Sequence, residues 1–357
     1  MSSARDLSQK VKGIALALGA DLVGICAARA TPHSEQLGAW LARGFAGKMD
    51  YLERSAAKRQ DPEQLFEGAR SMIVVGLMYE SASAQPGPGE GGARGTISRY
   101  AMGDDYHEVM GDRLRALAAG VEALVGKPFE SRVYVDTGPV LERVAAAYAG
   151  LGWVGKNTCL IHPELGSYLF LGVLVTALEL EADALVDDLC GSCTACLDAC
   201  PTDALVGPRL MNATRCIAYT TIEDPGPIPQ ALRAAHGELI YGCDICQEVC
   251  PWNSRRARKW PEDPLGLRAR LEPRAHWAGP SLAWILELDE QAWQHATRAS
   301  AMRRSKRRGL LRNALVAAGN SQDESLRPQI LRLAADDDPL LAEHAAWAIE
   351  QLDLAAR

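Results

Sequence analysis

The chain has 357 residues, of which 48% are hydrophobic and 23% are charged, and its formal net charge is −7. This length and composition exclude a disordered, collagen-like or coiled-coil protein and predict more than one domain with a large core. The net charge alone argues against a nucleic-acid binder, but the charge is unevenly placed. Fourteen Lys and Arg against six Asp and Glu lie between Arg255 and Arg312, so the rest of the chain is strongly acidic.

The first 180 residues alternate between helical and strand patterns, which predicts layers of helices on a sheet. Helices are expected at 6–19, at 104–124 and after Pro139, and strands at 21–27, 70–79, 132–135 and 168–176. The Gly- and Pro-rich stretch at 81–95 is expected to be a loop. The longest apolar run, at 168–178, is too short to span a membrane, and the N-terminal pattern is that of an amphipathic helix. We therefore expect a cytoplasmic protein without membrane contact.

The C-terminal part of the chain is basic at first and helical to its end. Helices are expected at 307–318, at 325–335 and around 341–352, with breaks at Gly319–Asn320 and Asp336–Pro339. Short helices joined by tight turns are typical of stacked helical repeats of the HEAT type. The sequence therefore predicts a small HEAT-like helical domain.

Eight of the ten cysteines lie in one stretch of about sixty residues. The first run has the spacing Cys-x2-Cys-x2-Cys-x3-Cys-Pro of bacterial ferredoxins, and the second run also ends in Cys-Pro. Disulfides are disfavoured in a long cytosolic chain, and zinc favours two separated Cys-x2-Cys pairs, so we predict two [4Fe–4S] clusters. The last cysteine of each ferredoxin run binds the other cluster. This crossover assigns one cluster to Cys190, Cys193, Cys196 and Cys250 and the second to Cys200, Cys216, Cys243 and Cys246. Cys26 and Cys159 are expected to be small core residues.

Six short motifs outside and around the cysteine runs carry a resemblance to a known family. They are Lys58–Pro62, Ser98–His107, Val135–Pro139, Gly152–Thr158, Tyr219–Glu223 and Tyr241–Asn253. With these segments, which are spread over nearly the whole chain, the sequence resembles the epoxyqueuosine reductases of tRNA modification. The basic segment Arg303–Asn313 and the helical tail are also similar to that family's C-terminus.

The resemblance implies an α+β protein of three parts. These are a cobalamin-binding α/β domain (1–180), a ferredoxin-like two-cluster domain (181–260) and a HEAT-like domain for tRNA binding (261–357). It implies base-off cobalamin, which suits a chain without an Asp-x-His-x-x-Gly motif. The implied reaction reduces the epoxide of epoxyqueuosine to queuosine at the wobble position of a tRNA with a GUN-type anticodon. An external low-potential electron donor and a monomeric state are also expected.

The resemblance also assigns roles to residues. Asp136 matches the family's proton donor, and we expect burial against the corrin to raise its pKa, because a free Asp has a pKa of about 3.9. The alternative for Asp136 is a helix cap. Contacts with cobalamin are expected from Arg59, Arg99, Asp136, Trp153, Gly155, Lys156, Asn157, Thr158 and Gly242. Contacts with the tRNA are expected from Tyr106, His107, Arg303, Arg304, Arg307, Arg308 and Arg312.

Several of these residues also have a purely structural explanation, and the implied function has two rivals. Arg59 and Arg99 are also explained as surface ion pairs, Trp153 as a core side chain in a turn, and the basic helix as a solvated face. A reductive dehalogenase of a small organohalide is one rival function, although the basic tail gives it no support. A non-enzymatic iron–sulfur electron carrier or cobalamin-handling protein is the other, and it predicts that Asp136 is dispensable.

Overall fold

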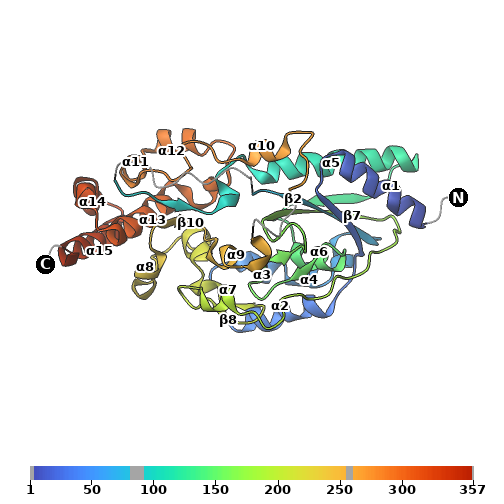
Figure 1. Ribbon diagram of the computed structural model, residues 1–357, viewed down its shortest axis with the longest axis horizontal. Helices are drawn as coiled ribbons and strands as arrows, with labels where there is room; N and C mark the ends of the chain where they lie inside the picture. The colour runs from blue at the N-terminus through green and yellow to red at the C-terminus, as the bar shows by residue number, and fades with distance from the viewer. Residues whose placement is uncertain (1–3, 81–91, 255–259, 356–357) are drawn as a thin grey trace.

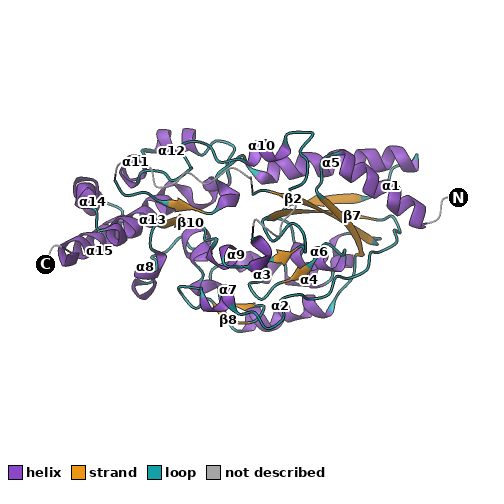
Figure 2. Ribbon diagram, in the orientation of Figure 1, coloured by secondary structure: helices purple, strands orange, loops and turns teal. Residues whose placement is uncertain are grey.

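The structure, a computed structural model, describes residues 4–80, 92–254 and 260–355. The largest sheet lies in the part of the molecule near the N-terminus, and the last helices form the opposite end (Figure 1). The molecule contains both helices and strands, which confirms the mixed class, and its C-terminal end is helical (Figure 2). Most of the loop expected at 81–95 lies outside the described residues.

The largest sheet has four strands in the order β1-β2-β7-β4. Its strands are β1 (Leu22–Ala27), β2 (Ser71–Met78), β4 (Ser131–Tyr134) and β7 (Leu169–Thr176), each within two residues of its predicted bounds. All three pairs are antiparallel, so the sheet is of the α+β type and the expectation of an α/β domain is wrong in this respect. A buried apolar run looks the same in either direction, so the sequence pattern does not distinguish the two arrangements.

Helices cover both faces of this sheet. All eight residues of β2 are buried, and their side chains alternate between the two faces. Ile73 and Val75 pack in one hydrophobic cluster with α1 and α5, whereas Val74 packs in another with residues of α6. Figure 1 shows α1 and α5 above the sheet and α6 below it. The bounds are α1 (Ala4–Ala17), α5 (Tyr106–Val125) and α6 (Glu142–Tyr148).

Three further helices follow β1 and carry residues to the site described below. They are α2 (Pro32–Ala42), α3 (Asp50–Arg54) and α4 (Ala56–Gln60). Helix α2 begins with a capping box, in which Thr31 and Ser34 exchange side-chain to backbone hydrogen bonds, and Pro32 stands at its first position. A 3-10 turn at Pro62–Leu65 then leads toward β2.

The cysteine-rich region consists of short elements, as its Cys, Gly and Pro spacing predicts. They are α7 (Ala195–Asp198), β8 (Leu205–Gly207), β9 (Leu210–Met211), the π-helix η4 (Tyr219–Glu223), α8 (Gln230–His236), β10 (Leu239–Tyr241) and α9 (Ile245–Glu248). β10 pairs in parallel with β3 (Thr96–Ile97). A separate hairpin of β5 (Trp153–Val154) and β6 (Leu160–Ile161) precedes the region.

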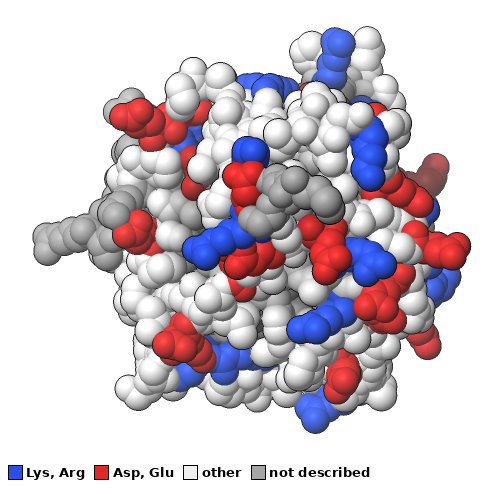
Figure 3. Space-filling model, turned by 90° about the vertical axis from the view of Figure 1, so that its right-hand side faces the viewer, with Lys and Arg blue, Asp and Glu red and all other residues white. Residues whose placement is uncertain are grey.

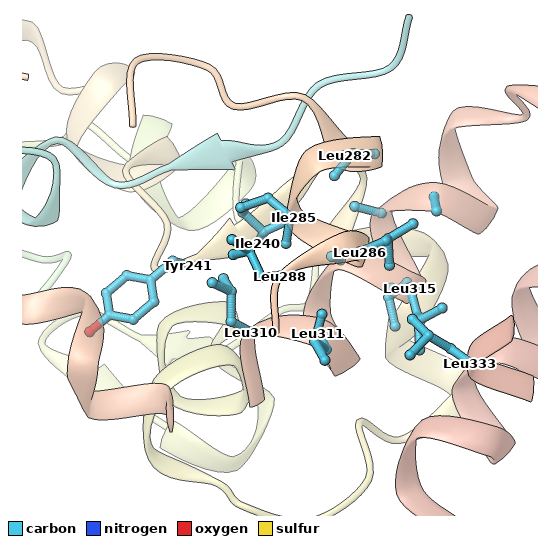
Figure 4. Close-up of a cluster of buried hydrophobic side chains, with 14 of the residues drawn as sticks. Ile240, Tyr241, Leu282, Ile285, Leu286, Leu288, Leu310, Leu311, Leu315 and Leu333 are labelled. Carbon is cyan, nitrogen blue, oxygen red and sulfur yellow. The ribbon is translucent and has the colours of Figure 1, made fainter. Parts of the chain in front are cut away.

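Five C-terminal helices share one core, part of which Figure 4 shows. They are α11 (Leu282–Glu287), α12 (Glu290–Ala296), α13 (Lys306–Ser321), α14 (Arg327–Ala334) and α15 (Pro339–Ala355), and α10 (Leu267–Leu271) precedes them. The break expected at Gly319–Asn320 is wrong, because α13 continues to Ser321 and ends at Gln322 in the left-handed conformation. The break expected at Asp336–Pro339 is confirmed.

This core also takes side chains from segments far away in the sequence. Ile97, Ile240 and Tyr241 pack in it beside Leu282 and Leu310 (Figure 4). Conversely, Leu267 and Leu271 of α10 pack against the main sheet. The C-terminal helices are therefore joined to the rest of the molecule through hydrophobic contacts, and the division into three domains and the HEAT-like repeat stay predictions.

Candidate functional site

A cavity of about 840 Å³ lies beyond the C-terminal end of β4. Its volume is at the upper end of the roughly 300–1,000 Å³ that is typical of ligand pockets. Side chains from five separate parts of the chain meet in it. The wall consists of Tyr51, Arg54, Ser55, Ala57, Lys58, Arg59, Gln64, Tyr100, Tyr106, His107, Asp136, Thr137, Pro139, Ile222, Glu223, Tyr241, Ala301 and Arg304.

Asp136 faces this cavity from a strained turn. Its φ of 57° is in the left-handed region, which Asp tolerates better than most residues but which still costs energy. Its backbone N–H donates to Glu142 Oε1 at 2.6 Å. Its side chain is 63% exposed, so the carboxylate is accessible from the cavity. A strained backbone that presents an accessible carboxylate is a common feature of functional sites.

His107 lies next to Asp136 at the start of α5. Asp105 caps this helix by accepting from the His107 backbone N–H, and its Oδ1 also lies 2.7 Å from His107 Nδ1. The other ring nitrogen, Nε2, lies 3.6 Å from Asp136 Oδ2. This Nε2 is buried and has no hydrogen-bond partner among the described residues. Buried polar atoms are rarely left unpaired, so Nε2 is positioned for a group that enters the cavity.

The charges in this site shift several pKa values. Burial opposes the charge of His107, but Asp105 and Asp136 outweigh it and raise the pKa of His107 to about 9. The contact with His107 lowers the pKa of Asp136 and outweighs the opposing effect of desolvation in the cavity. Burial, followed by repulsion from Asp136, raises the pKa of Glu142 to about 7. The expectation of a raised pKa at Asp136 is therefore wrong for the protein alone, because a neighbouring imidazolium stabilises the carboxylate.

Tyrosines form much of the apolar wall. Tyr106 stacks on Phe170 with ring centroids 4.2 Å apart, and Tyr100 meets it edge-on at 6.0 Å. Burial raises the pKa of Tyr100 and Tyr106 well above the usual value, so both hydroxyls stay neutral. Sequence reasoning did not single out Tyr51 or the cavity roles of Tyr100 and Tyr241. The last two lie in the motifs quoted above, whereas no sequence signal marks Tyr51.

Cations outnumber acids on the cavity wall. Arg54, Lys58, Arg59 and Arg304 line it together with Asp136 and Glu223. Arg59 is buried and donates to the carbonyl of Val140 and to Ser55 Oγ, which fixes its position behind Asp136. Arg304 forms a bidentate pair with Glu223 at 2.7 and 3.1 Å. The cavity is therefore suited to a large ligand with apolar surface and anionic or amide groups.

The eight clustered cysteines fall into two spatial sets. Burial raises the pKa of Cys250, and the nearby Cys190 and Cys196 raise it further. Burial also raises the pKa of Cys243 to about 12, with contributions from Cys216 and Cys200. Cys246 interacts in turn with Cys243 and Cys216, and Cys196 with Cys190 and Cys193. These proximities match the crossover assignment, so the donor set fits two clusters with four thiolates each.

All ten cysteines are free thiols in the structure. Within the described ranges, no three His, Cys, Asp or Glu side chains converge closely enough to hold one metal ion. The choice of iron–sulfur clusters over zinc therefore depends on the spacing of the cysteine runs.

Comparisons with known proteins agree with this geometry. Residues 189–253 match the family described as a 4Fe-4S double cluster binding domain, and residues 59–137 match epoxyqueuosine reductase QueG, DUF1730. The epoxyqueuosine reductase of Gloeobacter violaceus is 44% identical over 317 residues, which cover 88% of this chain and 96% of that protein. That of Escherichia coli is 38% identical over 347 residues, which cover 97% and 89%. The chain belongs to the epoxyqueuosine reductase family.

A solved structure of the epoxyqueuosine reductase family extends the likeness to the fold. It is an epoxyqueuosine reductase with an epoxyqueuosine-modified tRNA-Tyr stem loop, and it is 32% identical with a TM-score of 0.86. The match covers 97% of this chain and 90% of that one.

In the part of the chain that the structure describes, no helix is long and apolar enough to cross a membrane.

The residues that the epoxyqueuosine reductase resemblance assigned to cobalamin separate into two groups. Arg59 and Asp136 line the cavity, whereas the other seven are absent from its wall. Arg99 forms two ion pairs within the protein, since its guanidinium contacts Asp244 at 3.1 Å and Glu248 at 2.8 Å. A Cβ on Gly242 would lie 2.6 Å from Ser98 Cβ, so this glycine permits close packing of two segments.

The predicted loop Gly152–Thr158 contacts the cysteine runs. Trp153 and Asn157 are each 3% exposed, and their polar atoms bond to Cys190 and Cys246. The contact of these two residues with cobalamin stays a prediction, as it does for Gly155, Lys156 and Thr158.

The predicted tRNA contacts also differ among themselves. Tyr106 and His107 lie in the cavity. Arg312 is 1% exposed and donates to the carbonyls of Thr220, Asp224 and Gly226, so the prediction that it contacts tRNA is wrong. Arg312 is buried because it lies on the face of α13 that packs against η4. The sequence does not indicate this, because Arg312 belongs to a run of cations whose other members are at least partly exposed.

The four remaining arginines of the basic segment are at least partly exposed. Arg308 pairs with Asp338, and Arg307 donates to the carbonyl of Leu288 at 2.7 Å. Arg303 lies over the ring of Trp293 at 6.0 Å. Acids from elsewhere in the fold thus partly neutralise this segment. By contrast, the end of the molecule that carries the N-terminus has cations and acids interspersed (Figure 3).

Proposed function

We propose that this protein reduces the epoxide of epoxyqueuosine to the alkene of queuosine at the wobble position of a tRNA anticodon. The observation that carries the proposal is the Asp136–His107 pair, which faces a large cavity beside two cysteine sets in a chain of this family. We further assign cobalamin as the group that occupies part of this cavity together with the nucleoside.

The overall reaction fixes what the site must provide. An epoxide, two electrons and two protons give an alkene and one water, so both a reductant and a proton source are needed. Cobalamin, when bound, would supply the reducing chemistry that no side chain offers, and the two cysteine sets would hold the clusters that serve as its electron source. An external low-potential donor must reload the clusters, and the exposed Cys193 places one cluster near the surface.

The cavity wall supports the choice of cofactor. Its volume of about 840 Å³ and its row of tyrosines suit a large, flat ligand. Arg59 and Lys58 supply donors for the amide groups around a corrin, and only Gly242 separates Tyr241 from Cys243. The cavity and the second cysteine set are thereby linked through three consecutive residues.

The Asp136–His107 pair itself holds the proton that the departing epoxide oxygen needs. At neutral pH, His107 is an imidazolium and Asp136 is a carboxylate, because each stabilises the charge of the other. As negative charge develops on the oxygen, Asp136 donates to it the proton that it takes from His107. Asp105 fixes the ring orientation through Nδ1, so that Nε2 stays directed at Asp136.

The substrate reaches the cavity along the basic segment. Arg303 and Arg304 lie in the last turn of η6 (Ala301–Ser305), where Arg304 lines the cavity, and Arg307 and Arg308 follow in α13. These side chains supply contacts to phosphates, which position the RNA without reading its sequence. The nucleobase itself contacts the aromatic wall that includes Tyr106. Following the resemblance to the epoxyqueuosine reductase family, we also propose a GUN-type anticodon, a monomeric state, a cytoplasmic location and the three-part domain organisation.

A direct assay tests this function. The protein, purified without oxygen and loaded with iron, is given cobalamin, a chemical reductant and tRNA that contains epoxyqueuosine. Mass spectrometry of the digested nucleosides should show queuosine, and omission of cobalamin should abolish its formation. Absence of queuosine with a fully loaded protein would contradict the proposal, and dechlorination of a small organohalide instead would favour the dehalogenase alternative.

A further inference from the structure

The hairpin loop at 153–159 touches both cysteine sets. It connects β5 to β6 in a tight turn, in which Gly155 N–H donates to the Cys159 carbonyl at 2.8 Å and Thr158 has a φ of 67°. A Cβ on Gly155 would lie 2.4 Å from Ile161 Cδ1, so the turn requires glycine there. The loop is therefore a rigid element rather than a flexible contact.

Two side chains of the loop reach the first cysteine set. The Trp153 indole N–H donates to Cys190 Sγ at 3.3 Å. Lys156 Nζ donates to the carbonyls of Gly191 and Cys193 at 2.7 and 2.8 Å, which places a positive charge beside the same run. Trp153 also meets Trp252 edge-on at 5.1 Å, so the indole has little freedom to move.

A third side chain reaches the second set. Asn157 Nδ2 donates to the Cys246 carbonyl at 3.2 Å, and Asn157 Oδ1 accepts from the Cys159 backbone N–H. Asn157 therefore joins the loop directly to a ligand of the second cluster.

We propose that this loop sets the reduction potentials of the two clusters separately. Trp153 and Lys156 act on the cluster of Cys190, and Asn157 acts on the cluster of Cys246. A donor or a positive charge near a ligand sulfur stabilises the extra electron of the reduced cluster and so raises its potential. All three are positioning residues, since they act through the cysteines. The proposal rests on the clusters and not on the epoxide reaction.

Redox titration tests the proposal without tRNA or cobalamin. In the titration, dithionite gives one electron to each [4Fe–4S]²⁺ cluster to form [4Fe–4S]⁺, and paramagnetic resonance follows the two signals. In Trp153→Phe we expect the potential of the first cluster to fall, so that about tenfold less of it is reduced at a fixed potential, which equals about 59 mV for one electron. The second cluster should be unchanged. Asn157→Ala removes the donor to the Cys246 carbonyl and should give the converse pattern.

Matched controls separate tuning from folding. Trp40→Phe removes an indole N–H that donates to the Met211 carbonyl, and Asn320→Ala removes an amide that donates to the carbonyls of Arg233 and Gly237. Neither should shift either potential. Equal potentials in Trp153→Phe and the parent, at equal iron content, would overturn the proposal. If Trp153→Phe binds less iron, Lys156→Met decides: a lower potential of the first cluster supports tuning, and an unchanged one overturns it.

Discussion

The cavity around Asp136 and the loop at 153–159 differ in how completely their polar groups are paired. In the loop, Trp153, Lys156 and Asn157 each bond to a cysteine or its neighbour. In the cavity, His107 Nε2 has no hydrogen-bond partner among the described residues, and Asp136 is exposed in a strained conformation. Both segments belong to motifs of the same family. The pairing of polar groups, and not the motif, therefore distinguishes the residues that we propose to meet the substrate from those that we propose to support the clusters.

The largest effect is expected when the carboxylic acid of Asp136 is removed from the cavity. Asp136→Asn keeps the size of the side chain but cannot donate the proton that His107 holds. We expect single-turnover conversion of epoxyqueuosine to fall by about 10²–10⁴-fold, the usual contribution of general acid catalysis. Quenched-flow sampling with nucleoside mass spectrometry measures this rate.

A matched substitution controls for the loss of charge. Asp112→Asn also removes a carboxylate near α5, but Asp112 is exposed and pairs only with Arg115. It should convert the substrate at the parental rate. Full activity of Asp136→Asn would end the role of this residue as proton donor and favour the electron-carrier alternative.

The second prediction concerns stability and separates two arginines of α13. Arg312→Ala removes a buried guanidinium that bonds three carbonyls around η4, so we expect a loss of about 3–5 kcal/mol in the free energy of unfolding. Arg308→Ala breaks an exposed pair with Asp338 and should cost about 1 kcal/mol or less. Urea unfolding of the two variants measures both values. Equal losses of unfolding free energy in the two variants would mean that the burial of Arg312 does not make it more important for stability than Arg308.

The third prediction concerns the rim of the cavity. The double substitution Arg303→Ala and Arg304→Ala should weaken tRNA binding and reduce the slope of log affinity against log salt by roughly 0.7–0.9 for each phosphate that the protein no longer neutralises. The double substitution Arg115→Ala and Lys127→Ala, which also removes two exposed cations, is the control. If both pairs change the slope equally, the basic segment has no specific part in RNA binding.

Much of this architecture is accessible from sequence because it depends on local patterns. Strands β2 and β7 follow from apolar runs, and the two cysteine sets follow from the spacing of ferredoxin runs. Asp136 and His107 were assigned through motif resemblance, but the sign of the pKa shift of Asp136 depends on its contact with His107, which lies 29 positions earlier. The burial of Arg312 likewise depends on packing between distant elements. Such long-range contacts leave no periodic signal in the sequence.

The central claim is that His107 and Asp136 together hold the proton at the cavity, and its most direct test is a pH profile. His107 has a raised pKa, so its imidazolium is present below pH 9 and is lost as the pH rises through about 9. Single-turnover conversion by the parent protein should fall over the same range. His107→Gln should be slower by about tenfold or more, and it should lack this decline. A decline near pH 9 that persists in His107→Gln, or an unchanged rate in that variant, would contradict the account.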